Sequence, residues 1–392
     1  MTMLRANQVA TLSDIEAMSR RAELAIEQIR ETLLSPDSIK SAPIFNISQL
    51  EHFTQVDRNK INYAVKKAEI PAGAMPEGGG RRTWTTGEVQ QSVRHFRPEI
   101  QRPKGVSAVT IAVANFKGGV TKTTTAATLA QGLSLRGKKV LLVDVDAQAS
   151  LTTLFGLLPG VEINQPDTLA PLFAGDEEDA QYAVRKTYWP DLDLIPAMTR
   201  LYASEFKLPS RQKDEPGFEF WRVLDRGLDP LRDTYDVIII DTPPSLSYTT
   251  INAVMAADGL VVPVPPSTLD FASLSQFWSL YLDIAHELNE LRGEAKKFEF
   301  VDILASRVDA NDTSSRVVKT WLREVYAERV LATEIPRTSV AGTASVGFGT
   351  VYDLPKGSTN SGTYNRAFDA YDQFVNEVDA QIQAVWVSWS EA

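Results

Sequence analysis

The stretch Asn115–Thr125, NFKGGVTKTTT, is the part of the chain that decides its fold. It follows the short apolar run Val109–Val113 and leads into Thr123–Leu135, which has the composition of a helix. A glycine-rich loop between a buried strand and a helix points backbone N–H groups at whatever lies on the helix N-terminus, and an anion is favoured there. The sequence therefore predicts a phosphate-binding loop between a strand and a helix.

Three residues distinguish this loop from the general pattern G-x-x-x-x-G-K-[ST]. Phe116 and Thr121 stand at the two glycine positions, and an additional lysine, Lys117, stands near the start. The absence of glycine at position 121 requires a φ angle that a β-branched side chain tolerates. Because the loop alone matches this pattern imperfectly, the prediction also needs support from other motifs in the sequence.

The other loop residues suit a nucleotide. Gly118 and Gly119 let the backbone approach phosphate oxygens without a Cβ in the way. Lys122 can reach the β- and γ-phosphates, and the Thr123 hydroxyl can ligate Mg²⁺. The residues expected to contact the nucleotide are Lys117, Gly118, Gly119, Val120, Thr121, Lys122, Thr123 and Thr124.

Two further stretches place acidic residues at the ends of apolar strands. Asp241 follows Val237–Ile240 in the manner of a Walker-B strand, whose acid supports the Mg²⁺ shell. Asp144 and Asp146 follow Leu141–Val143, and strand geometry predicts that residues two apart lie on the same side. The carboxyl ends of strands form the crevice where open α/β sheets bind ligands. One such acid is more often a helix cap, but three converging sites predict a Mg²⁺–nucleotide site.

Apolar strands alternate with helical segments from Ser107 onward. This alternation predicts an α/β fold with a mostly parallel, doubly wound sheet that helices cover on both faces. The acidic segment 159–188 is loosely patterned, and we expect a peripheral insertion there. The expected strands are 109–113, 139–143, 192–195, 237–240, 260–264 and 298–304.

The N-terminal part contains one amphipathic helix over about 14–34. Ser13 and Glu16 form a capping-box pattern, and apolar residues then recur every three or four positions. This stripe packs either on its own chain or on the same helix of a second chain. The polar, proline-containing stretch that follows separates the helix from the next segment and favours pairing between two chains.

The next segment has the layout of a winged helix-turn-helix. The pattern of residues 47–68 predicts two short helices joined by a turn at 54–56. A glycine-rich stretch follows, and a third short helix is predicted to begin at Thr86. Residues 40–106 carry 11 Lys and Arg against 6 Asp and Glu, which suits an anionic partner. The alternative is a solvated basic helix on a small structural domain. The residues expected to contact DNA are Arg58, Asn59, Lys60, Asn62, Lys66, Lys67, Arg81 and Arg82.

Composition excludes several other classes of site. The chain has no cysteine, so disulfides, iron–sulfur clusters and thiolate zinc sites are ruled out. Its three histidines are scattered in the sequence, which argues against a histidine metal site. No apolar run reaches the roughly 18 residues of a membrane span. With no secretory signal pattern at the N-terminus, a cytoplasmic location is expected.

The motifs KGGxxK[ST], VDxDxQ and IIIDTPP, in this order and spacing, are similar to those of the ParA/MinD class of deviant Walker-A ATPases. The resemblance covers about 107–385, and Leu192–Pro196 and Ile335–Arg337 also match family landmarks. With its basic front segment, the whole chain resembles the large ParA proteins, which accept a non-glycine at position 121. The implied domains are a dimerisation helix at 1–38, a winged helix at 39–98, a linker at 99–106 and an ATPase domain at 107–392.

The resemblance implies a mechanism and partners. Two chains would sandwich two ATP molecules with Mg²⁺, with Lys117 reaching phosphates on the partner chain and Lys122 acting within its own chain. Asp146 would position the attacking water, whereas Thr123, Asp241 and Asp144 would support the metal. The resemblance implies a DNA-partition (segregation) ATPase. Its homodimer would bind nucleoid DNA, a ParB-type centromere-binding protein would stimulate hydrolysis, and the winged helix would repress the chain's own operon.

The sequence leaves one alternative activity and one alternative class of protein to consider beside the partition ATPase. The alternative activity is that of a transcriptional repressor whose nucleotide state tunes operator affinity. MinD-like members, the alternative class, end in a basic amphipathic helix that binds membranes. Here residues 367–392 contain five acids and no Lys or Arg, so no membrane binding is expected.

A second DNA surface is expected on the ATPase domain. Positions 316, 319 and 323 are three and four residues apart, which places three cations on one helix face. The alternative is a solvated helix whose charge is balanced by Glu324 and Glu328. The residues proposed for this surface are Arg316, Lys319, Arg323, Arg337 and Lys356.

Overall fold

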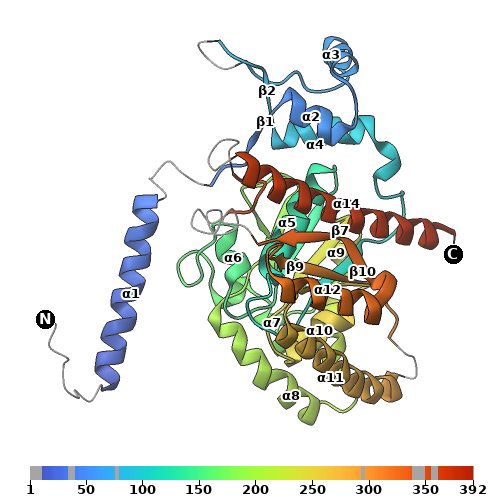
Figure 1. The fold of residues 1–392 in the computed structure, drawn as a ribbon. Coiled ribbons are helices and arrows are strands. Elements are labelled where there is room, and N and C mark those ends of the chain that lie inside the picture. Colours follow the sequence, from blue (N-terminus) through green and yellow to red (C-terminus); the bar gives the residue numbers. More distant parts are fainter. Residues whose placement is uncertain are drawn as a thin grey trace, which may run out of the picture. The chain divides into compact units, whose positions relative to one another are not determined.

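The computed structural model describes residues 11–33, 40–75, 79–292, 296–337, 349–354 and 361–391 (Figure 1). The chain divides into two compact units, Met1–Ser41 and Ala42–Ala392. Lys356, one of the proposed DNA contacts, lies outside the described residues. Among the helices described, none has the length and hydrophobicity that crossing a membrane requires.

In the first unit, the described residues 11–33 form the helix α1 (Leu12–Leu33). Its cap lies two residues before the predicted one: Thr11 N donates to Asp14 Oδ2 at 2.8 Å, and Asp14 N donates back to Thr11 Oγ1 at 3.3 Å. Thr11 and Asp14, three residues apart, therefore form the reciprocal pair of hydrogen bonds that defines a capping box. Ile15 and Met18 of the predicted apolar stripe are exposed.

The second unit begins with three short helices, in the order the sequence predicts: α2 (Ile47–Thr54), α3 (Arg58–Lys66) and α4 (Thr86–Phe96). Each is capped by a side chain at its N-terminus, Asn46, Asp57 and Thr85 respectively. The strand β2 (Thr83–Thr85) pairs with β1 (Ile44–Asn46) in antiparallel register, with Phe45 opposite Trp84. An isolated bridge between Ala74 and Thr83 closes the segment that carries Arg81 and Arg82.

The segment expected to be a linker packs tightly against the sheet domain. Ile100, in the short helix η1 (Pro98–Ile100), is buried, and its carbonyl accepts a hydrogen bond of 3.1 Å from Lys138 Nζ. Arg102 Nε lies 2.8 Å from Asp236 Oδ1. One hydrophobic core therefore runs from the front helices into the sheet domain.

An eight-stranded sheet forms the centre of the second unit, in the order β10-β9-β8-β3-β7-β4-β6-β5. All neighbouring strands are parallel except the edge pair β5–β6. The mostly parallel sheet is thus confirmed, while β5 and β10 were not predicted. The strands are β3 (Val109–Val113), β4 (Val140–Asp144), β5 (Arg185–Lys186), β6 (Leu192–Ile195), β7 (Val237–Asp241), β8 (Gly259–Val264), β9 (Phe300–Val308) and β10 (Val330–Pro336).

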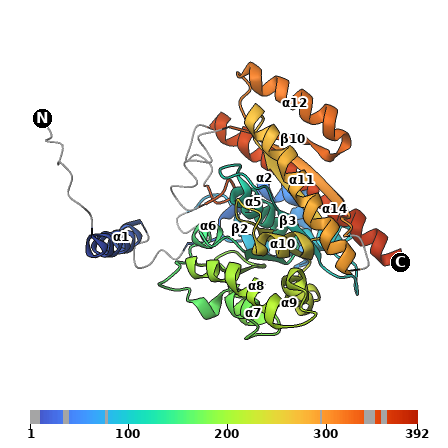
Figure 2. The same ribbon diagram turned by 90° about the horizontal axis from the view of Figure 1, so that it is seen from below.

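Helices cover both faces of this sheet (Figure 2). One core contains residues of α5 (Lys122–Leu135) and of the C-terminal helix α14 (Ser361–Glu391), and the other contains residues of α8 to α11. The remaining α-helices are α6 (Ser150–Leu154), α7 (Ala170–Ala174), α8 (Ser204–Asp214), α9 (Val223–Arg232), α10 (Tyr248–Ala256), α11 (Thr268–Arg292) and α12 (Thr313–Tyr326). Short 3₁₀ helices are η2 (Gln165–Asp167), η3 (Gln181–Ala183), η4 (Thr199–Ala203), η5 (Phe220–Arg222) and η6 (Ala327–Arg329).

Candidate nucleotide site

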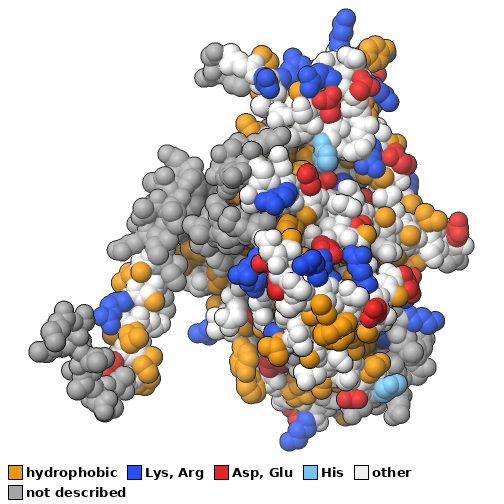
Figure 3. Space-filling model, viewed as in Figure 1, with side chains coloured by type: hydrophobic (Ala, Val, Ile, Leu, Met, Phe, Trp, Pro, Cys, Tyr) orange, Lys and Arg blue, Asp and Glu red, His pale blue; other side chains and the backbone are white. Residues whose placement is uncertain are grey.

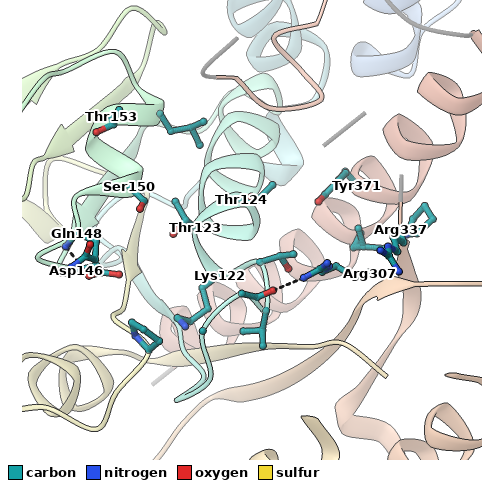
Figure 4. A pocket seen from close by; sticks show the side chains of 18 residues that line it. Lys122, Thr123, Thr124, Asp146, Gln148, Ser150, Thr153, Arg307, Arg337 and Tyr371 are labelled. Carbon is teal, nitrogen blue, oxygen red and sulfur yellow. Dashed lines mark hydrogen bonds between the residues drawn. The ribbon is translucent and has the colours of Figure 1, made fainter. Parts of the chain in front are cut away.

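A cavity of about 750 Å³ opens at the carboxyl ends of the central strands (Figure 4). The loop between β3 and α5 forms one wall with residues 118–124. Asp146 and Gln148 line a second wall, and Arg307 and Arg337 line the opposite one. The cavity lies where parallel α/β sheets bind ligands, because the strand order places the β3 loop between β7 and β8.

The backbone conformation of Thr121 differs from the predicted one, which was a φ that a β-branched residue tolerates. Its φ of 76° and ψ of 18° lie in the left-handed region, which β-branched residues rarely adopt. The expectation of a φ suited to threonine was therefore wrong: the loop keeps the glycine conformation and places threonine in it. Such a residue costs about 1–3 kcal/mol and persists because the surrounding structure holds it.

Lys122 lies at the N-terminus of α5 and is buried. Its Nζ donates a hydrogen bond of 2.9 Å to the carbonyl oxygen of Lys117. Burial lowers the pKa of Lys122, and the carboxylates of Asp241 and Asp146 oppose that shift. A phosphate entering the cavity would replace the Lys117 carbonyl as the partner of this amine.

Thr123 and Asp241 form the part of the site that fits a metal ion. Thr123 Oγ1 donates a hydrogen bond of 2.7 Å to Asp241 Oδ2. Asp241 is fully buried, and its other oxygen, Oδ1, has no hydrogen-bond partner. Burial, together with the charge of Asp144, raises the pKa of Asp241 well above its usual range. Mg²⁺ binds through one or two carboxylates and substrate phosphates, so an unpartnered buried carboxylate oxygen beside a threonine hydroxyl fits it.

Asp144 and Asp146 occupy different places. The strand β4 ends at Asp144, so Asp146 lies in the loop beyond the strand and the alternation of strand side chains does not apply to it. Asp144 is buried and accepts hydrogen bonds from Thr152 N at 2.9 Å and Thr152 Oγ1 at 2.7 Å; like Asp241, it is not among the residues that line the cavity. Burial raises the pKa of Asp144 to about 7. Asp146 does line the cavity. A metal role for Asp144 remains a prediction.

Lys117 points away from the cavity that its own loop forms. Its Nζ lies 2.6 Å from Asp270 Oδ1, at the start of α11. Lys117 is absent from the residues lining the 750 Å³ cavity and lines instead an adjoining cleft of about 350 Å³, together with Asp309. The cavity and the cleft share residues 118–120, and of the two lysines of the loop Lys122 lines the cavity and Lys117 lines the cleft.

The wall of the cavity that Arg307 and Arg337 form was not predicted from the sequence. Arg307 lies at the end of β9 and donates a hydrogen bond of 3.0 Å to the carbonyl oxygen of Gly119. Pro336 and Arg337 follow at the end of β10, and Tyr371 reaches the cavity from α14. The sequence signal that could have revealed Arg307 and Arg337 is their position at the carboxyl end of a strand. The strand predicted from the sequence ended at Leu304, and β10 was not predicted. Arg337, expected to contact DNA, lines this cavity.

Apart from Arg337 and the undescribed Lys356, the residues proposed to contact DNA lie on two surfaces, and all of them except Lys319 are exposed. Figure 3 shows Lys and Arg side chains over α12, with acidic side chains among them. Lys319 pairs with Glu334 at 2.6 Å and Arg323 pairs with it at 3.2 Å, so the counter-charge comes from β10 and not from the expected Glu324 and Glu328. Arg316 is exposed. On the front segment the exposed side chains are Arg58, Asn59, Lys60, Asn62, Lys66, Lys67, Arg81 and Arg82.

A buried parallel sheet with a phosphate loop, an inward lysine and a Walker-B acid defines a P-loop nucleotide-binding protein. Residues 108–291 match a family model described as an AAA domain. The chain is 31% identical over 386 residues to "Putative replication protein A" of Rhizobium rhizogenes, covering 94% of this chain and 95% of that protein. It is 29% identical over 371 residues to "Protein SopA" of Escherichia coli K12, covering 93% and 94%.

Two solved structures extend the comparison. Cobyrinic acid a,c-diamide synthase from Mycobacterium smegmatis, with a bound ATP analog and magnesium, is 31% identical over 69% of this chain and 93% of its own, with a TM-score of 0.54. A structure described as a partition protein shares the fold over 95% of this chain and 98% of its own, with a TM-score of 0.66 and 20% identity. The chain belongs to the ParA/MinD-type family of P-loop ATPases.

Proposed function

We propose that this ATPase is a DNA-partition motor that works as a nucleotide-sandwich dimer. The position of Lys117 carries the proposal, because this lysine does not line the cavity that its own loop forms. It lines instead the adjoining cleft, which shares residues 118–120 with that cavity. A lysine so placed is available to phosphates held by a second chain. The relatives support a partition role, since one structure of the same fold is described as a partition protein.

Each residue of the site then has a distinct task. Lys122 and the N–H groups at the start of α5 bind the β- and γ-phosphates. Thr123 and Asp241 hold Mg²⁺, which when bound neutralises charge on the phosphates. Asp146 lines the cavity and orients the attacking water. Lys117 completes the site of the partner chain, so hydrolysis depends on dimerisation.

DNA binding is proposed at two surfaces. The exposed cations of α3 suit an operator, with the helix in the major groove, and the arginines at 81 and 82 suit phosphates beside it. The cations of α12 suit nucleoid DNA of any sequence. A ParB-type partner bound to the centromere would stimulate hydrolysis and so release the dimer from DNA.

A second candidate activity, nucleotide-tuned repression, is supported by contacts between α4 and α5. Gln90 Nε2 donates to Ser134 Oγ at 2.5 Å, and Arg94 Nε donates to the carbonyl oxygen of Gly137 at 2.7 Å. The helix α5 begins at the phosphate loop and ends at these contacts. A shift of α5 caused by a change of bound nucleotide would therefore be transmitted to α4 through these hydrogen bonds.

The experiment that tests the proposal measures DNA binding by the full chain with ADP, ATP and a non-hydrolysable analogue. The motor requires that random DNA is bound with ATP or its analogue and released with ADP. Binding confined to upstream DNA, with no nucleotide-dependent binding to random DNA, would favour the repressor instead. Substituting Lys60 and Lys67 by alanine is expected to remove operator binding alone.

A further inference from the structure

The strand β9 ends in an irregular step beside the phosphate loop. Its register with β10 shifts between Ala305 and Val308, where three residue steps along β9 run beside two along β10. Arg307 lies within this step and has a φ of 52°, in the left-handed region that arginine rarely adopts. The extra residue makes this step a β-bulge, and bulges beside active sites redirect side chains.

The bulge lets two consecutive side chains reach the same loop. In a regular strand, neighbours such as Ser306 and Arg307 point to opposite faces of the sheet. Here Ser306 Oγ donates a hydrogen bond of 3.2 Å to the carbonyl oxygen of Val120. Arg307 donates one of 3.0 Å from Nη1 to the carbonyl oxygen of Gly119, drawn as a dashed line in Figure 4. The two residues form a clamp on the phosphate loop, the 306–307 clamp.

The clamp determines which way two N–H groups of the loop point. In a trans peptide unit the N–H and the C=O point in opposite directions. The carbonyl oxygens of Gly119 and Val120 point toward β9, so the N–H groups of the residues that follow them point away from it. In the sheet, β3 lies between β8 and β7, and the side away from β9 is the side where Asp241 ends β7 and Asp146 follows β4. The N–H groups of Val120 and Thr121 are thereby turned toward the nucleotide cavity, which both residues line.

The clamp also holds the left-handed conformation of Thr121. This residue has a φ of 76°, and the peptide unit that precedes it is the one whose carbonyl oxygen Ser306 binds. Relaxation of Thr121 to a right-handed φ would rotate that peptide unit, break the Ser306 hydrogen bond and turn the Thr121 N–H away from the cavity. Among the described residues, no side chain caps the N-terminus of α5, so the N–H groups there are left to an anionic ligand.

We propose that Ser306 and Arg307 are positioning residues of the ATPase site, which hold the phosphate loop with two N–H groups turned toward the phosphates of the nucleotide. Arg307 is exposed and lines the cavity, so it also adds a positive charge beside the phosphates. Ser306 is fully buried and lies outside the residues that line the cavity, so it acts on the nucleotide only through the loop. The inference concerns nucleotide binding by each chain and depends neither on dimerisation nor on a role in partition.

The test measures the affinity of full-chain variants for pyrophosphate, by displacement of a fluorescent ADP. Ser306→Ala removes one neutral hydrogen bond, so pyrophosphate should bind roughly threefold to tenfold more weakly. Ser306→Cys repeats the test with little change in packing, because a thiol is only a weak donor. Ser92→Ala is the matched control: Ser92 is also fully buried, and its Oγ donates to the carbonyl oxygen of Glu88 at 2.7 Å within α4. This control should bind pyrophosphate as the wild type does.

A second background shows whether the clamp acts through the strain at position 121. Glycine adopts the left-handed conformation without strain, so in Thr121→Gly the loss caused by Ser306→Ala should shrink to less than about twofold. Equal losses in both backgrounds would overturn the inference. Wild-type affinity for pyrophosphate in Ser306→Ala and Ser306→Cys, even with a lowered melting temperature, would reduce Ser306 to a structural role and overturn it as well. Wild-type affinity in Arg307→Ala would remove Arg307 from the clamp.

Discussion

The hydroxyl of Thr123 donates a hydrogen bond of 2.7 Å to Asp241, whose second carboxylate oxygen is buried and without a partner. Of the three acids that follow the described strands β4 and β7, Asp144, Asp146 and Asp241, only Asp241 has a buried oxygen without a hydrogen-bond partner. Asp241→Asn should therefore lose Mg²⁺-dependent tightening of nucleotide binding by tenfold or more, since one carboxylate ligand is removed. Titration with a fluorescent nucleotide, with and without Mg²⁺, measures the effect. Equal Mg²⁺ dependence in variant and wild type would contradict this metal site.

Thr121→Gly should stabilise the nucleotide-free protein by about 1 kcal/mol. Glycine removes the left-handed strain at this position, and its larger entropy in the unfolded chain offsets part of the gain. Thr121→Ala is the control, because it keeps a Cβ at the same φ. Chemical denaturation measures both variants. A Thr121→Gly protein less stable than the wild type would show that the backbone at 121 is not strained.

Asp302 provides a test of pH dependence away from the site. It is buried in β9 with Oδ2 unpartnered, and burial, reinforced by Glu377, raises its pKa to about 7. Between pH 4 and pH 7 the unfolded chain loses this proton while the folded chain keeps it, so the contribution of Asp302 to stability falls as pH rises. A rise of about three pKa units corresponds to about 4 kcal/mol. Asp302→Asn should therefore be more stable than the wild type by about 4 kcal/mol at pH 8 and nearly equal to it near pH 4. Thermal unfolding across pH checks this, and a constant difference would refute it.

The surface over α12 predicts a change in salt dependence. Replacing Arg316 and Arg323 by alanine should flatten the log–log salt slope of ATP-dependent binding to random DNA by about 0.9 for each lost contact. Lys319→Ala is the comparison. Lys319 and Arg323 both pair with Glu334, but the Lys319 side chain is 22% exposed against 56% for Arg323, so its loss should change the slope less. Arg337 is left unchanged, since it lines the nucleotide cavity. A wild-type slope in the double variant would place the DNA surface elsewhere.

Sequence patterns predicted the features that depend on local order. The loop between β3 and α5, the strand before Asp241 and the three front helices follow from apolar runs, glycines and capping residues. These signals are local because strand burial and helix capping are determined by residues within a few positions.

The features that sequence reasoning missed depend on contacts between distant residues. Glu334 neutralises α12 from a strand that the pattern did not reveal, and Asp270 reaches Lys117 from a helix more than 150 positions away. Thr121 shows a further limit, because its φ is imposed by the loop around it and overrides the preference of threonine. Such relationships are set by tertiary packing.

The most direct measurement of the central claim mixes two inactive variants. Lys117→Ala is expected to bind ATP without hydrolysing it, and Asp146→Ala is expected to bind ATP and dimerise without hydrolysis. In a mixed dimer the Asp146→Ala chain supplies Lys117 to the intact site of the other chain. If Lys117 acts across the dimer and the two variants pair at random, an equimolar mixture should recover about a quarter of wild-type ATPase activity. Half of the dimers are then mixed, and each mixed dimer has one complete site out of two. A mixture as inactive as its two components would contradict the account.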